Sequence, residues 1–100
     1  MANVAQKVNN MLVEEHYVLA MAEFAQNHTE WRKFRSCTAE YCFTENYIIL
    51  RSYSTIVAVI NQEWGVCYDA LRMVYGYTST SNQHICKFWH DFGSTRIVWR

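Results

Sequence analysis

The chain contains no proline and only three glycines in 100 residues. Because these two residues most often interrupt helices and strands, a chain so poor in both should consist of regular elements joined by short connections. Hydrophobic residues make up 51% of the chain and charged residues 18%, which is sufficient for a buried core. We therefore expect residues 1–100 to form a single domain.

Charge and hydropathy disfavour several classes of protein. Nine basic side chains are balanced by nine acidic ones, which argues against a protein that holds nucleic acid mainly by bulk positive charge. No run of about 18 apolar residues is present, so we expect no membrane span. Residues 1–10 lack the segments of a signal peptide, which predicts a cytoplasmic protein with reduced cysteines. We expect buried, inert thiols at Cys37, Cys42, Cys67 and Cys86.

A long N-terminal helix is predicted from about residue 3 to about residue 27, because apolar side chains recur at intervals of three and four. Asn3 is the expected N-cap, and Glu15 touches the edge of the apolar stripe. The sequence leaves open whether this helix packs on its own sheet or on a second copy, and the helix could continue or restart through residues 29–34. The apolar stripe consists of Val4, Val8, Met11, Leu12, Val18, Leu19, Ala22 and Ala25.

The middle of the chain changes to patterns that are typical of β-strands. Residues 55–60 are nearly all apolar, which predicts a central strand covered on both faces. We expect turns at residues 45–46 and at residues 61–65, where Gly65 can adopt a left-handed conformation. The other expected strands cover residues 40–44, 47–53, 66–73 (alternatively a short helical turn) and 95–99.

A second helix is predicted over residues 81–92. Thr80 and Gln83 match a capping box, and Gly93 follows the last apolar position, where glycine often ends a helix. The apolar face of this helix consists of Ile85, Phe88, Trp89 and Phe92. The order of elements predicts an α+β fold, with an antiparallel sheet of about four to five strands, a long N-terminal helix and a shorter C-terminal helix.

Motifs for catalysis or metal binding are not evident. The cysteine and histidine spacings do not match a zinc site, and His84 and Cys86 fall on different faces of a helix. The chain shows no nucleophile motif, no acid pair flanking a cleft and no glycine-rich phosphate loop. We expect no enzymatic activity, no metal and no cofactor.

Aromatic residues make up 16% of the chain. Most of them lie at core-periodic positions, which favours packing in the core, but tyrosine and tryptophan are also enriched on partner-binding faces. With no visible active site in a small chain, partner binding is the expected class of function. Trp64 is the strongest candidate for such a contact, because a side chain at the tip of a hairpin is too far from the core to be buried there. Residues 75–80 could alternatively hold a phosphate at a helix N-terminus, or this loop and His84 could be structural. The candidate partner-binding residues are Trp64, Arg72, Tyr75, Tyr77, Arg96 and Arg100.

Residues 53–93 resemble the core of small proteins encoded by phages and prophages of Gram-positive bacteria. The shared pattern is Tyr-x-Thr-x-Val-Ala from Tyr53, Tyr-Gly-Tyr-Thr from Tyr75, hydroxyl residues at Thr80 and Ser81, and His-Ile-x-x-Phe from His84. The chain departs from this pattern at Cys86, Trp89 and His90. The family is largely uncharacterised, so the resemblance implies a viral origin and brings no catalytic residues.

The resemblance and the aromatic content together predict a phage-encoded protein that binds a host protein in the bacterial cytoplasm and inhibits it by covering its surface. The most specific version of this prediction is an anti-CRISPR protein that acts on a Cas effector. The alternatives are a phage nucleic-acid-binding accessory or regulatory protein, and a homodimer or other self-associating protein formed through an edge strand such as residues 95–99.

Overall fold

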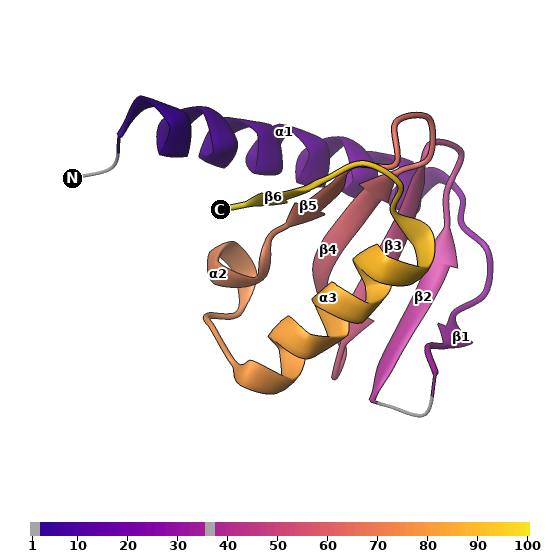
Figure 1. Ribbon diagram of the computed structural model, residues 1–100. Coiled ribbons are helices and arrows are strands. Elements are labelled where there is room, and N and C mark those ends of the chain that lie inside the picture. Colours follow the sequence, from indigo (N-terminus) through magenta and orange to yellow (C-terminus); the bar gives the residue numbers. More distant parts are fainter. Residues whose placement is uncertain (1–2, 36–37) are drawn as a thin grey trace.

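The computed structural model describes residues 3–35 and 38–100 and has an α+β fold, as expected (Figure 1). Its strands form one six-stranded sheet in the order β1-β2-β3-β4-β5-β6. The elements are α1 (Val4–Gln26), β1 (Arg32–Lys33), β2 (Ala39–Phe43), β3 (Tyr47–Ser52), β4 (Thr55–Asn61), β5 (Cys67–Asp69), α2 (Leu71–Val74), α3 (Ser79–Phe92) and β6 (Ile97–Trp99). Within the described residues, no helix is both long enough and apolar enough to cross a membrane.

The sheet is mixed, which corrects the expectation of an antiparallel sheet of fewer strands. Strands β1 to β5 pair antiparallel with their sequence neighbours, but β6 runs parallel to β5. Parallel neighbouring strands need a crossover connection, and α2 and α3 provide it between β5 and β6. The segment expected to form strand 66–73 divides into the short β5 and the helical turn α2.

Helices cover both faces of the sheet, with α1 on one side and α3 on the other (Figure 1). Successive side chains of β4 point to opposite faces of the sheet. Ala58 and Ile60 belong to the buried hydrophobic cluster under α3, whereas Val59 belongs to the buried cluster under α1. Burial of each large aliphatic side chain contributes about 1.5–3 kcal/mol. The prediction of a central strand covered on both faces is therefore confirmed.

Three helix-terminal residues were predicted from the sequence, and the structure agrees with two of them, Asn3 and Gly93. The Asn3 side chain accepts a hydrogen bond from the Gln6 amide at 2.8 Å, which confirms the N-cap of α1. Gly93 is the C-cap of α3, where its N–H donates to the Trp89 carbonyl. Thr80 is not a cap: α3 begins earlier, and the Thr78 hydroxyl accepts from the Ser81 amide at 3.2 Å.

The structure settles two points about the connections. Gly65 has a φ of +69°, which confirms the left-handed position in the β4–β5 turn. Residues 29–34, where the sequence left a continued or restarted helix open, are not helical and join the sheet edge instead. Thr29 donates its amide to the Phe43 carbonyl and accepts the Phe43 amide on its hydroxyl, both at 2.9 Å.

Candidate functional site

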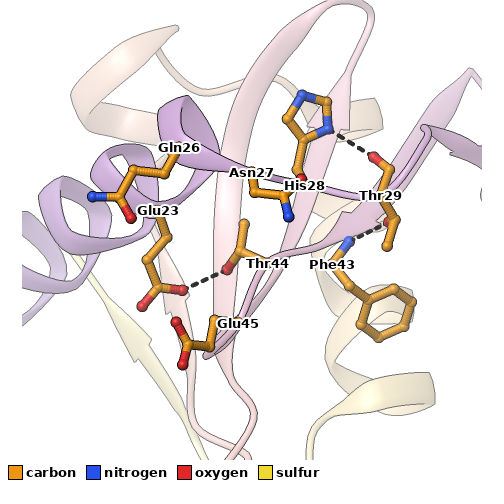
Figure 2. Close-up of a pocket in the computed structure, with 8 residues that line it drawn as sticks. All are labelled: Glu23, Gln26, Asn27, His28, Thr29, Phe43, Thr44 and Glu45. Atoms are coloured by element: carbon orange, nitrogen blue, oxygen red, sulfur yellow. Dashed lines mark hydrogen bonds between the residues drawn. The ribbon is translucent and has the colours of Figure 1, made fainter.

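A pocket of about 390 Å³ lies where the C-terminal end of α1 meets the turn between β2 and β3 (Figure 2). Its lining was not predicted from the sequence, because residues of α1 and of a turn about twenty positions later meet only in the folded chain. Figure 2 shows the carboxylates of Glu23 and Glu45 on the same side of it. The lining residues are Glu23, Gln26, Asn27, His28, Thr29, Phe43, Thr44 and Glu45.

Glu23 has a structural role in this pocket. Its oxygens accept hydrogen bonds from the Thr44 hydroxyl and from the amide and side chain of Asn46, at 2.7–2.8 Å. Desolvation raises the pKa of Glu23, but the hydrogen bonds from Asn46 and Thr44 outweigh it, so that the pKa lies below its ordinary value. The carboxylate is thus charged and already occupied by partners of its own chain.

The side chains around this pocket give it negative charge. Two carboxylates lie beside the C-terminal end of a helix, where unpaired carbonyl groups carry partial negative charge. Among the described residues, no group of three or more His, Cys, Asp or Glu side chains could hold a metal ion.

Three of the predicted partner-binding residues lie together at the end of β5. The guanidinium of Arg72, on α2, lies 4.7 Å from the centroid of the Tyr77 ring. Tyr75 and Tyr77 are each 51% exposed, and Gly76 between them has a φ of +89°. The left-handed glycine turns the chain between two aromatic residues, so that both remain on the surface. We call Arg72, Tyr75 and Tyr77 the α2 patch.

The remaining predicted residues do not join the α2 patch. Trp64, 63% exposed, lies in the β4–β5 turn at the opposite end of β5. Arg96 is at that same end, since its carbonyl accepts the Cys67 amide at 2.9 Å. Arg100, after β6, is paired with Glu14 of α1. The structure therefore separates the six residues: Arg72 contacts Tyr77, Tyr75 lies two residues before Tyr77 in the chain, and the other three residues lie apart from them.

His84, which the sequence left between a structural and a functional role, is buried in the core. Its Nδ1 lies 2.8 Å from the hydroxyl of Ser52, which lies 2.9 Å from the hydroxyl of Ser81. Burial lowers the pKa of His84, and the nearby positive charge of Lys87 lowers it further. Ser52 is 1% exposed and cannot reach a substrate, so this serine–histidine contact supports a structural role.

The cysteines differ in their surroundings. Cys42 and Cys67 are buried, as expected, and burial raises the pKa of Cys42 to about 11 and that of Cys67 well above its ordinary value. Both thiols are therefore protonated at neutral pH and poorly reactive. Cys86 is exposed, which corrects the expectation of burial. Cys37 lies outside the described residues.

Comparison with protein-family models, with curated protein sequences and with solved structures found no match to this chain.

Proposed function

We propose that this chain is a binding protein that acts through the α2 patch and inhibits a host protein by covering part of its surface. The observation that carries the proposal is the placement of Arg72 over the ring of Tyr77, with the equally exposed Tyr75 two residues earlier in the chain. Tyrosine and arginine dominate the binding energy of many interfaces, because they combine large apolar area with hydrogen-bonding groups.

The α2 patch is held in place by backbone contacts of α2. The amides of Tyr75 and Gly76 both donate to the carbonyl of Leu71 at 3.0 Å, and Leu71 itself is buried in the core. The cation–π contact already restricts Arg72, so less side-chain freedom is lost when a partner binds. These features support a contact surface that is arranged before the partner arrives.

The identity of the partner rests on the resemblance of residues 53–93 to small proteins of phages and prophages. This resemblance favours a bacterial host protein as the partner, and the most specific candidate is a Cas effector. Arginine and tyrosine also stack on nucleic-acid bases, so a regulatory protein that binds nucleic acid is the alternative. The balanced charge of the chain favours the protein partner, because it provides no long-range attraction for phosphates.

The test is a quantitative pull-down from host lysate, with and without nuclease, using the wild type and Y75A/Y77A. We expect one protein to be captured in both arms and to be lost at least tenfold with the double variant. The matched control is Y53N, because Tyr53 is 52% exposed on another turn and its positive φ suits asparagine. A partner that disappears with nuclease contradicts the proposal, and so does full capture by Y75A/Y77A.

Inhibition is tested with the captured protein once it is identified. If it is a Cas effector, we expect DNA cleavage to be inhibited by the wild type and by Y53N, and to continue in the presence of Y75A/Y77A. Undiminished cleavage with excess wild-type protein contradicts the inhibitory role.

A further inference from the structure

Most of the apolar stripe of α1 faces away from the sheet, whereas Leu12 packs against the core cluster under the helix. Val13 and Ala20, on the sheet side, are fully buried. On the opposite side Val4 is 77% exposed, Met11 69% and Val18 65%. Large contiguous apolar patches are uncommon on the surface of monomeric proteins, and they often mark a surface that binds another protein.

The spacing along this outer side is that of a coiled-coil seam. The residues recur at alternating intervals of four and three, which is the heptad pattern that two packed helices share. Six of the seven positions are apolar, and the exception is Glu15. The outer seam consists of Val4, Val8, Met11, Glu15, Val18, Ala22 and Ala25.

We propose that the outer seam binds the outer seam of a second copy of this chain, with the two helices antiparallel and overlapping over residues 4–15. In this register Val8 lies opposite Met11 of the second copy, and Met11 lies opposite its Val8. Val4 lies opposite Glu15 of the second copy at the two ends of the overlap, where a carboxylate can remain in water. This inference is independent of the α2 patch.

Charges beside the seam favour this register over two alternatives. Lys7 and Glu14 occupy equivalent positions along one flank, one heptad apart. In the antiparallel overlap Lys7 lies beside Glu14 of the second copy, and the symmetry of the pair creates this contact twice. On the other flank of the seam, Ala5 lies beside Leu12 of the second copy. Glu14 also binds Arg100 of its own chain through Oε1, which leaves Oε2 for the lysine.

Two other arrangements of the two helices place like charges together. A parallel pair would set Glu15 against Glu15 within the seam. A longer antiparallel pair, with Val8 opposite Val18, would set Glu14 beside Glu14 near its centre and Glu15 against Met11. Like charges at such close positions are destabilising.

The position of α1 leaves room for the second copy. The N-terminal turns of α1 extend beyond the edge of the sheet (Figure 1). Since the seam lies opposite the buried side chains Val13 and Ala20, the sheet of the second copy would lie on the far side of the helix pair. The sheet edge itself is a poorer site for self-association, because antiparallel pairing of β6 about Val98 sets Arg96 opposite Arg100 of the second copy.

Sedimentation velocity over a concentration series tests the proposal. We expect the wild type to form a dimer, K7E and E14K each to weaken it by about fivefold to tenfold, and K7E/E14K to restore it. A wild type that remains monomeric up to millimolar concentration overturns the proposal, and so does a charge swap that fails to restore the dimer.

Two matched substitutions test the register. Met11 and Val18 are similarly exposed seam residues, but only Met11 lies within the proposed overlap. We expect M11D to give a monomer and V18D to retain the dimer, with circular dichroism confirming that both variants are folded. Loss of the dimer in V18D with an unchanged dimer in M11D overturns the register.

Discussion

Both carboxylate oxygens of Glu23 accept hydrogen bonds from Asn46, one from its backbone amide at 2.8 Å and one from its side chain at 2.7 Å. The last turns of α1 are thereby joined to the turn between β2 and β3. A charged acceptor strengthens such bonds, so the ionised form of Glu23 should stabilise the fold.

We expect E23Q to lower the free energy of unfolding by about 1 kcal/mol at pH 7. The pKa of Glu23 is lowered by folding, so its contribution is present above the ordinary value of 4.5 and is lost as the pH falls through the folded-state pKa. The difference between the two proteins should therefore shrink in acid. Urea unfolding at pH 7 and at pH 3 measures it, with E45Q, in the same pocket, as the control.

Acid should also destabilise the core through His84. Because burial lowers its pKa, the unfolded chain binds a proton more readily below the ordinary value of 6.5. We expect the free energy of unfolding to fall between pH 7 and pH 5, with a smaller slope in H84N, whose side chain can still reach Ser52. Equal slopes in the two proteins would contradict this expectation, even if H84N is less stable at every pH.

Gly65 has no room for a side chain. An added Cβ would lie 1.9 Å from the Ser94 hydroxyl oxygen, at a φ of +69°. We expect G65A to lower the free energy of unfolding by about 2 kcal/mol or more. Gly76 provides the control, since its φ is +89° but an added Cβ meets nothing within 4 Å. A thermal melt should show G76A to be the milder variant.

The turn between β3 and β4 places two non-glycine residues at positive φ, with Tyr53 at 59° and Ser54 at 120°. A two-residue hairpin turn with both φ angles positive favours asparagine and glycine. We expect S54G to raise the free energy of unfolding by about 1 kcal/mol, whereas S54A, which keeps the Cβ, should give no gain. Urea titration of the three proteins decides between these outcomes.

Hydropathy predicted the helix α1 but did not indicate which of its faces packs on the sheet. Its inner side includes His16 and Tyr17, which are polar by composition. In the fold the His16 ring contacts the Tyr47 hydroxyl at 2.7 Å, and the Tyr17 hydroxyl donates to the Ile56 carbonyl at 3.1 Å. Amphipathic rings can line a core once their polar atoms find partners, so most of the more aliphatic stripe was left outside.

In the rest of the fold, features that depend on short sequence patterns could be predicted, whereas features that depend on contacts between distant segments could not. The α3 helix, the turn at Gly65 and the exposed aromatic residues follow from patterns only a few residues long. The direction of β6 depends on a crossover, and the pocket at Glu23 depends on a contact between distant segments. The residues of the α2 patch were among the predicted contact residues, but neither the contact of Arg72 with Tyr77 nor the separation from Trp64 and Arg96 could be deduced, because both depend on how β5, β6 and α2 are placed in the fold.

The parallel pairing of β5 with β6 also bears on the order in which the chain folds. Strands β1 to β5 join as successive hairpins whose loops close quickly, but β6 finds β5 only after residues 70–96 have been placed. We therefore expect contacts of β6 to be absent from the folding transition state. Substitutions such as V98A would then accelerate unfolding and leave the folding rate nearly unchanged.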